Sequence, residues 1–349
     1  MKRSISRICL VAFLTSLIGV PALGQQAASD PNDPDLTEWE VPFAESRPRD
    51  PYVGPEGRVW FVGQRSDYAA ALDPATGEFS RCEMDEGTGP HNLIVAENGT
   101  IYYAGNRAAH IGIIDPETCE IEQIMMPDER ARDPHTLVFD ADGDIWFTVQ
   151  SGNFIGYLDT DTREVRLVEA PEVESGRSRS SRPYGIVMDS GDRPWIALFN
   201  TNKIATVDPE TFELTTFDLP DEAARPRRLV IDSRDIVWYV DYSRGYLGRL
   251  DPESGEVREW QNPGGEDSRP YGTAIDEHDR VWFVETGLEP NTFVGFDTET
   301  EEFISVVPVE SGAGAIRHMF YDPETNSIWF GTDRNTVGRA VLPPPRTTS

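Results

Sequence analysis

The chain has 349 residues, a formal net charge of −30 at pH 7 and only 10% aromatic residues. A charge this negative argues against nucleic acid and anionic membranes as partners, because both repel an acidic surface. Beyond the amino terminus, no stretch approaches the roughly 20 apolar residues that a membrane-spanning helix needs. We therefore expect no membrane insertion.

The amino-terminal segment 1–24 has the pattern of a cleavable secretory signal peptide. Basic Lys2, Arg3 and Arg7 precede an apolar run at 8–20, and small residues lead to Gln25. We expect cleavage near Gln25, a flexible segment 25–35, and a soluble monomer in the periplasm or the medium. Removing the three basic residues changes the formal charge from −30 to −33.

Seven repeats with a period of 42 to 49 residues follow. Each contains an apolar stretch, a polar turn, a strand that begins with an aromatic residue, a third strand, an Asp-Pro type turn and an alternating fourth strand. Four short strands per repeat are typical of a β-propeller blade and not of a helical solenoid. The repeats are marked by Trp60-Phe61, Tyr102-Tyr103, Trp146-Phe147, Trp195-Ile196, Trp238-Tyr239, Trp282-Phe283 and Trp329-Phe330.

The two ends of the repeat region complement each other. The last repeat stops after its third strand, 336–341, while an additional strand, 36–41, precedes the first repeat. Closing the ring with this strand would remove two exposed sheet edges. The fold class predicted is all-β, a seven-bladed propeller over 36–343 with four-stranded blades, an amino-terminal strand in blade seven and a flexible tail at 344–349.

Cys82 and Cys119 remain after cleavage and lie in the outer parts of adjacent blades one and two. In an oxidising compartment such a pair can form a disulfide. Two inert buried thiols are the alternative. Neither cysteine has the neighbours of a metal site or of a nucleophile.

One position of the repeat carries histidine, tyrosine or arginine in every blade. It lies 11 residues before each aromatic marker and follows a proline in six of seven blades. Equal register in a closed repeat places equivalent residues on one ring, so these side chains should surround one mouth of the channel. The alternative is that each is a packing residue. The ring residues are Arg49, His91, His135, Tyr184, Arg227, Tyr271 and His318.

Carboxylates are expected near the same mouth. Asp241 and Glu285 stand three residues past the aromatic markers of blades five and six. Two converging carboxylates can bind a divalent cation or shift each other's pKa for acid–base chemistry. Equally, they can be ion-pair partners of Arg227 and Arg269.

Arginines also gather in the loops of this mouth, whereas acidic turns lie at the opposite end. The sequence therefore predicts a cationic mouth that favours a ligand rich in carbonyl, carboxylate or phosphate oxygens. The arginines are Arg47, Arg49, Arg65, Arg107, Arg132, Arg177, Arg179, Arg182, Arg225, Arg227, Arg228, Arg244, Arg269, Arg317 and Arg334.

The repeats resemble the streptogramin B lyase (virginiamycin B lyase) family. The resemblance rests on Arg-Pro-Tyr-Gly at 182–185 and 269–272, Gly-Pro-His at 89–91, Trp-Phe-Thr at 146–148 and Asp-Pro-Glu-Ser-Gly at 251–255. It implies a seven-bladed propeller that opens a cyclic depsipeptide by elimination. It also implies a histidine base, a second histidine that binds substrate, and Mg²⁺ held by an acid two residues before the base and by a Glu that closes a Trp-Phe-Thr-Glu strand.

By this resemblance His135 is the base, Asp133 the preceding acid and His91 the second histidine. The strand after His135 ends in Val149 where the family has Glu, and Glu285 closes the strand of a blade that carries Tyr271. The metal ligands suggested are Asp133, Glu285 and Asp241, and the substrate-binding residues are Arg49, Tyr184, Arg227, Tyr271 and His318.

Two functions remain open from the sequence. The first is a lyase-like or hydrolytic enzyme acting on an ester, a lactone or a depsipeptide-like small molecule, with His135 or His91 as base and arginines binding the oxyanion. The second is a periplasmic propeller that binds a ligand or a protein partner without turnover.

Overall fold

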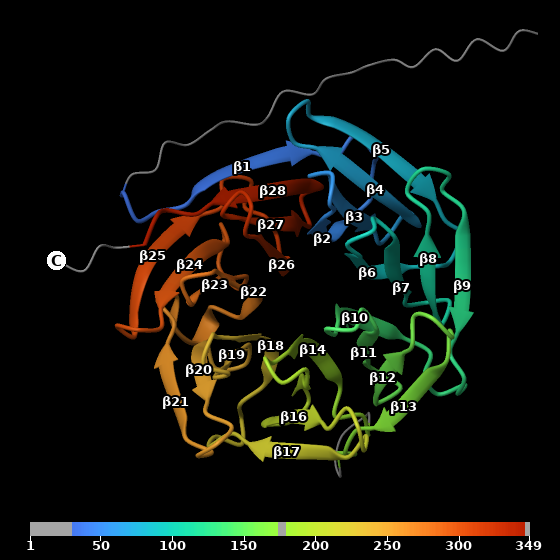
Figure 1. Cartoon of the computed structure of the whole chain (residues 1–349). Helices are drawn as coiled ribbons and strands as arrows, with labels where there is room; N and C mark the ends of the chain where they lie inside the picture. The colour runs from blue at the N-terminus through green and yellow to red at the C-terminus, as the bar shows by residue number, and fades with distance from the viewer. Residues whose placement is uncertain (1–29, 174–178, 346–349) are drawn as a thin grey trace, which may run out of the picture.

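The computed structural model describes residues 30–173 and 179–345, and it is a closed ring of seven four-stranded antiparallel sheets around a central channel (Figure 1). Only one short helical turn, η1 at Gly265–Asp267, interrupts the strands of this described part. The predicted all-β, seven-bladed propeller is confirmed. The expected signal peptide at 1–24 lies outside the described residues.

Each blade runs from an inner strand at the channel to an outer strand at the rim, and the inner strands of neighbouring blades contact each other around the ring. Blade one consists of β2 (Pro48–Val53), β3 (Val59–Gly63), β4 (Tyr68–Asp73) and β5 (Glu78–Glu83). Blade two consists of β6 (Pro90–Val95), β7 (Ile101–Gly105), β8 (His110–Ile114) and β9 (Ile121–Met125). Blade three consists of β10 (Pro134–Phe139), β11 (Ile145–Val149), β12 (Phe154–Leu158) and β13 (Val165–Glu169).

Blades four to seven follow the same order. Blade four consists of β14 (Pro183–Met188), β15 (Pro194–Leu198), β16 (Lys203–Val207) and β17 (Leu214–Asp218), and blade five of β18 (Pro226–Ile231), β19 (Val237–Asp241), β20 (Tyr246–Leu250) and β21 (Val257–Gln261). Blade six consists of β22 (Pro270–Ile275), β23 (Arg280–Glu285), β24 (Thr292–Asp297) and β25 (Glu302–Pro308). Blade seven consists of β26 (Ile316–Asp322), β27 (Ser327–Thr332), β28 (Thr336–Val341) and β1 (Asp35–Glu40).

Blade seven is completed by the amino-terminal strand, as predicted. Strand β1 pairs antiparallel with β28, with Leu36 opposite Ala340, and the ring of Trp39 stacks on Trp329 at 5.6 Å between centroids. The expected boundaries of this strand, 36–41, are one residue later than the observed ones. This pairing protects the last edge of the propeller.

The core consists of apolar side chains packed between neighbouring blades. Strands β3, β7, β11, β15, β19, β23 and β27 are buried throughout, whereas outer strands such as β9 and β13 are partly exposed. In blade six the indole of Trp282 donates to Asp276 at 2.9 Å, and the same carboxylate accepts from the backbone of the following turn. The tryptophan therefore fixes the turn that leads into its own strand.

An irregularity in the inner strand shapes the channel mouth. In every blade the pairing register between first and second strand shifts near the start of the first strand, as between Pro134 and Leu137; this strand begins with proline in blades one to six and with Ile316 in blade seven. A β-bulge places two successive residues against one partner and turns the strand. Two consecutive side chains of each blade can thus face the channel at this level.

Cys82 in β5 and Cys119, in the turn before β9, form a disulfide with Cα atoms 5.3 Å apart. The bridge joins the outer parts of blades one and two, as one of the two sequence alternatives predicted. No helix among the described residues is long and apolar enough to cross a membrane.

Candidate functional site

The ring residues predicted from the repeat register all lie on the inner strands, each close to the bulge (Figure 1). Five of them are almost fully buried although they are polar. The exposed fractions are 5% for Arg49, 6% for His91, 1% for His135, 3% for Tyr184 and 3% for Tyr271. The side chains therefore pack against one another and close this end of the channel, instead of lining an open mouth.

Two histidines and a tyrosine from three successive blades form a stack. The ring centroids of His91 and His135 are 3.8 Å apart, and those of His135 and Tyr184 are 4.3 Å apart. Burial and the nearby arginines Arg49 and Arg228 hold the pKa of both histidines well below the usual value. Both imidazoles are therefore neutral at pH 7.

His135 is held by one ring nitrogen only. Its Nδ1 lies 2.7 Å from the hydroxyl oxygen of Thr136, which also accepts a hydrogen bond of 3.1 Å from Arg228. The other nitrogen, Nε2, is buried and has no hydrogen-bond partner among the described residues. A neutral imidazole anchored at one nitrogen and free at the other is the arrangement required of a general base.

Tyr184 and Tyr271, from blades four and six, make a hydroxyl–hydroxyl hydrogen bond. Burial opposes ionisation of Tyr184, but Arg227, Arg228 and Arg49 outweigh it and lower its pKa to about 8. Burial and the neighbouring Tyr184 raise the pKa of Tyr271. The pair therefore tends to lose one proton and to keep the other.

Arg227 is enclosed by aromatic rings. Its guanidinium carbon lies 3.5 Å from the ring centroid of Tyr271, 4.2 Å from that of Tyr242 and 4.7 Å from that of Phe199. Such contacts stabilise a cation over the face of a ring. Arg227 is thereby fixed while its Nε stays without a hydrogen-bond partner in the described part of the chain.

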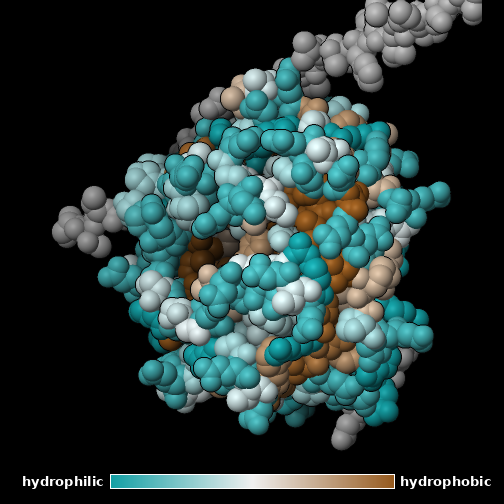
Figure 2. Space-filling view, turned by 45° about the vertical axis from the view of Figure 1, so that its right-hand side comes forward, coloured by the Kyte–Doolittle hydropathy of each residue, from teal (hydrophilic) through white to brown (hydrophobic). Residues whose placement is uncertain are grey.

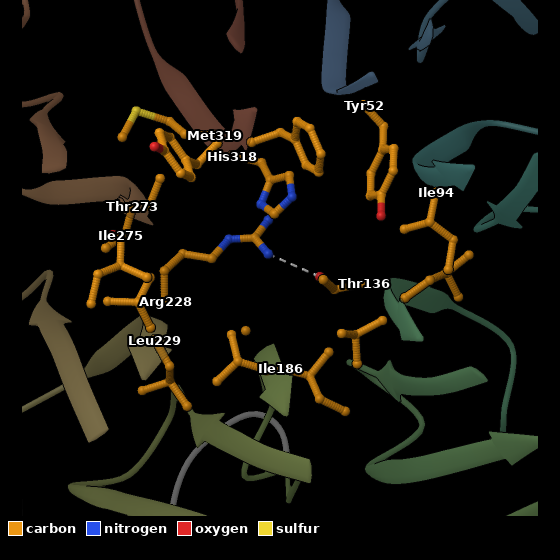
Figure 3. Close-up of a pocket in the computed structure, with 18 of the residues that line it drawn as sticks. Tyr52, Ile94, Thr136, Ile186, Arg228, Leu229, Thr273, Ile275, His318 and Met319 are labelled. Atoms are coloured by element: carbon orange, nitrogen blue, oxygen red, sulfur yellow. Dashed lines mark hydrogen bonds between the residues drawn. The ribbon is translucent and has the colours of Figure 1, made fainter. Parts of the chain in front are cut away.

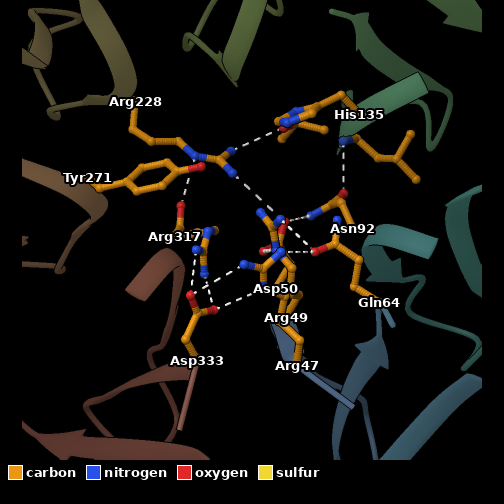
Figure 4. A network of polar contacts seen from close by, with 12 residues as sticks. Arg47, Arg49, Asp50, Gln64, Asn92, His135, Arg228, Tyr271, Arg317 and Asp333 are labelled. Carbon is orange, nitrogen blue, oxygen red and sulfur yellow. Dashed lines mark hydrogen bonds and ion pairs between the residues drawn. The ribbon is translucent and has the colours of Figure 1, made fainter. Parts of the chain in front are cut away.

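A second polar layer lies one residue further along the inner strands. Arg228 reaches across the channel to the backbone oxygen of Arg317, at 3.1 Å, and to Asp50, at 3.8 Å. Asp50 also pairs with Arg49 at 3.5 Å and accepts from Asn92 at 3.0 Å (Figure 4). Burial alone would raise the pKa of Asp50, but Arg49, His318 and Arg228 lower it.

Sequence reasoning gave this second layer no role beyond counting Arg228 among the mouth arginines. The repeat pattern could have predicted this layer, because Asp50, Asn92, Thr136 and Arg228 are polar residues at the position directly after each ring residue. The bulge explains why both positions matter. Asp50 itself has a φ of 46°, a left-handed conformation that is costly for a residue other than glycine and often marks functional sites.

The mouth is less cationic than its arginine count suggests. Arg47 and Arg317 share Asp333, and Gln64 accepts from both Arg47 and Arg49 (Figure 4). Arg244 pairs with Asp241, and Arg334 with Glu289. Several of the arginines counted at the mouth are therefore neutralised by acidic partners.

The three acids suggested as metal ligands are each occupied by their own loops. Asp133 accepts from the backbone of Ser151 and Gly152, at 2.7 and 3.0 Å. Asp241 accepts from the backbone of Arg225 at 3.0 Å and pairs with Arg244 at 2.6 Å. Asp241 is thus an ion-pair partner, as the alternative proposed, although of Arg244 and not of Arg227 or Arg269.

Glu285 is bound in the same way, by the backbone N–H of Gly264 at 2.7 Å and by the hydroxyl of Thr292. Both Glu285 and Asp241 are fully buried. Among residues 30–173 and 179–345, no group of three or more His, Cys, Asp or Glu side chains is arranged to hold a metal ion. Asp133, Asp241 and Glu285 as they stand do not fit a shared magnesium site, and we assign no chemical step to a metal.

The channel therefore contains a buried polar site of defined chemistry. It offers neutral histidines, a tyrosine of lowered pKa and guanidinium groups with free N–H bonds. Donors of this kind bind an oxyanion or a polarised carbonyl, and a neutral imidazole beside them can take a proton. Fold and site together define a seven-bladed propeller with a buried polar centre of histidine, tyrosine and arginine side chains in its channel.

The sequence profile of the virginiamycin B lyase family matches residues 169–342. The resemblance to the streptogramin B lyase (virginiamycin B lyase) family is thus confirmed: the chain is a virginiamycin B lyase-like propeller, and its matched segment contains blades four to six and three of the four strands of blade seven. A search of curated protein sequences finds no significant match.

Solved structures give the same fold. Virginiamycin B lyase from Staphylococcus aureus is 22% identical, with a TM-score of 0.77, over 88% of this chain and 99% of the lyase chain. A catalytically inactive histidine-to-alanine variant of that lyase, solved with quinupristin, is 23% identical, with a TM-score of 0.78, over 88% and 99% of the two chains.

A propeller of another kind is also similar. The extracellular domain of a putative one component system from B. thetaiotaomicron is 17% identical, with a TM-score of 0.64, over 86% of this chain and 40% of the other. Identities this low show the shared fold alone.

Proposed function

We propose that the protein is a lyase-like enzyme that removes a proton from an oxygen-rich small molecule at the ring, with His135 as the general base. One observation carries the proposal: the Nε2 atom of His135 is buried and unpartnered on a neutral imidazole beside buried arginines. A base of this kind contributes about 10²- to 10⁴-fold to a reaction rate.

The reaction proposed is an elimination. Nε2 of His135 takes the proton from the carbon next to a carbonyl, the freed electron pair forms a carbon–carbon double bond, and the carbon–oxygen bond at the next carbon breaks. The oxygen leaves as a carboxylate. Arg49, Arg227 and Arg228 are placed to stabilise the negative charge, first on the enolate oxygen and then on the leaving group.

The substrate class follows from the family match and from the charge of the site. A cyclic depsipeptide-like molecule, an ester or a lactone supplies both the acidic carbon and the leaving oxygen. The disulfide and the signal-like amino terminus support the proposal that the protein acts in the periplasm or outside the cell.

His318 is a second candidate for the base, because it is the ring histidine inside the segment that the family profile matches. Its Nδ1 is buried and unpartnered among the described residues, and burial lowers its pKa to about 4. His91 is proposed as a substrate-binding residue, since its Nδ1 is likewise unpartnered in the described chain and its ring contacts His135.

A binding protein without turnover is the second candidate function. It is favoured by Val149, which fills the position of the family Glu with an apolar, fully buried side chain, and by the closed packing of the ring. The extracellular domain of the B. thetaiotaomicron one component system has a similar fold, so this architecture also occurs outside lyases.

A substrate screen separates the two functions. The mature protein is incubated with quinupristin, with simple lactones and with aromatic esters, with and without Mg²⁺, and products are followed by mass spectrometry. With a cyclic substrate, a ring-opened elimination product retains the mass of the substrate, whereas a hydrolysis product gains one water; with an open-chain ester, elimination releases a carboxylic acid and an alkene, and hydrolysis an acid and an alcohol. Binding detected by calorimetry without any product would support the binding protein and overturn the enzyme.

A further inference from the structure

The channel contains a cavity of about 310 Å³ on the inner side of the polar ring. Its wall is mainly apolar and includes Ile94, Leu137, Ile186, Leu229, Ile275 and Met319, which come from six blades. Its polar part includes Arg228, His318, Thr136 and Thr273 (Figure 3). The volume is within the range of small-molecule sites.

Arg228 is the only charged residue among the described residues that line this cavity. It is 3% exposed, and its Nη1 and Nε donate to Thr136 and to the backbone of Arg317. Its Nη2 has no hydrogen-bond partner in residues 30–173 and 179–345 and is 3.8 Å from Asp50. The guanidinium group thus keeps one buried N–H group at Nη2 that no described residue satisfies with a hydrogen bond.

The charges around Arg228 do not balance. Asp50 is the carboxylate of this buried network, and it is also bound by Arg49 and Asn92. Arg227 adds a further cation, while the histidines are neutral and Tyr184, with a pKa of about 8, is mostly protonated at pH 7. A buried cation in excess is costly unless an anion accompanies it. The site therefore calls for a negatively charged group.

The ligand must reach the cavity from the face opposite the ring, because the ring side chains close the near end. The cavity wall includes Tyr52 and Phe139, which are partly exposed and also line a second cavity, of about 530 Å³, beside the hairpin turns at Glu97 and Asp142. Figure 2 shows a mainly hydrophilic surface that is hollowed at the channel, with apolar residues inside the hollow.

We propose that this cavity binds a small monocarboxylate with an apolar body. The carboxylate accepts hydrogen bonds from Nη2 of Arg228, and the apolar body contacts Ile186, Leu229 and Ile275. The inference shares Arg228 with the proposed lyase-like site but goes beyond that function, since the cavity lies below the ring and binding there requires no turnover.

The test uses octanoate and octan-1-ol, which share an apolar chain and differ in charge. Titration calorimetry with the mature protein should detect octanoate at one site and octan-1-ol at least tenfold more weakly. Charge-assisted hydrogen bonds are worth about 1.5–3 kcal/mol, so Arg228→Gln should weaken octanoate by about tenfold or more and leave octan-1-ol unchanged.

A matched pair of variants tests the location. Ile275→Trp should abolish binding by filling the cavity, whereas Ile231→Trp should not, because Ile231 holds the equivalent position of blade five but does not line the cavity. Near-ultraviolet circular dichroism confirms that both variants fold. Absence of octanoate binding, equal binding of octan-1-ol, or octanoate binding that Ile275→Trp leaves intact would each overturn the proposal.

Discussion

The imidazole rings of His91 and His135 lie 3.8 Å apart, tilted by 37°, although the two residues belong to different blades. Protonation of either ring would create a buried positive charge close to the other ring and to the nearby arginines, which is unfavourable. Burial, reinforced by the arginines, therefore keeps both histidines neutral, and Nδ1 of His91 and Nε2 of His135 have no hydrogen-bond partner within the described residues.

The first prediction concerns the base. If the proposed elimination is correct, His135→Ala should lower kcat by about 10²-fold or more with little change in KM. His278→Ala is the control, because His278 is exposed and lies outside the ring. A full loss in His318→Ala with a small effect in His135→Ala would transfer the role of the base to His318, and unchanged rates in both would disprove both residues as the base.

The second prediction concerns stability and pH. Burial lowers the pKa of His318 from 6.5 to about 4, even though Asp50 opposes the shift while Arg228 and Arg49 add to it. The folded state therefore binds fewer protons than the unfolded state between these values. Stability present above pH 6.5 should fall as the pH decreases to about 4, by about 3 kcal/mol for this residue.

Urea unfolding at pH 7 and at pH 4.5 measures this loss. His318→Gln, which cannot titrate, should show a smaller decrease between the two pH values than the unmodified protein. An equal decrease in both proteins would show that His318 does not have the lowered pKa. The carboxylates Asp50 and Asp333, whose pKa values are lowered, should add a further loss only below their ordinary value of 3.8.

The third prediction concerns the tyrosine pair. Because nearby arginines lower the pKa of Tyr184 to about 8, tyrosinate absorbance should appear in a step near pH 8, before the other tyrosines ionise. Tyr184→Phe should remove this step. A titration without any step below pH 9.5 would contradict the assignment, because that value approaches the ordinary tyrosine pKa.

The fourth prediction concerns the missing family Glu. Val149 is fully buried in an apolar cluster with Phe147, Phe154 and Ala131, and Asp133 is already bound by the following loop. Val149→Glu should therefore destabilise the protein by about 2–4 kcal/mol, the cost of burying a polar group without its partners. Thermal unfolding with and without Mg²⁺ measures this, and a large Mg²⁺-dependent stabilisation of the variant would contradict the expectation.

The fifth prediction concerns the bridge between blades one and two. The disulfide closes a loop with a sequence separation of 37 residues, so Cys82→Ser with Cys119→Ser should lower the free energy of unfolding by about 3–4 kcal/mol. Equilibrium unfolding in guanidinium chloride provides the value. A loss below about 1 kcal/mol would mean that packing of the outer strands, and not the bridge, joins these blades.

The fold could be predicted from the sequence because it is repeated seven times. Each aromatic marker, such as Trp146 or Trp282, sits at the same place in a blade, and the orphan strand before Trp60 could pair only with the incomplete last blade. Because the blades are equivalent, a residue at a given position of one repeat lies at the same level of the channel as its counterparts in the other blades. For the same reason the ring positions of His91, His135 and Tyr184 could be predicted from the sequence.

The tertiary structure alone decided what these residues contact. The bulge turns Arg228, Asp50 and Thr136 toward the channel, where residues from blades one, three and five meet across more than 170 positions of sequence. Asp241 and Glu285 share the ring's level but are captured by backbone N–H groups of their loops. Which groups form a hydrogen bond or an ion pair depends on their distance in the folded chain and on which other donors compete for the same acceptor. The spacing of a sequence repeat determines neither.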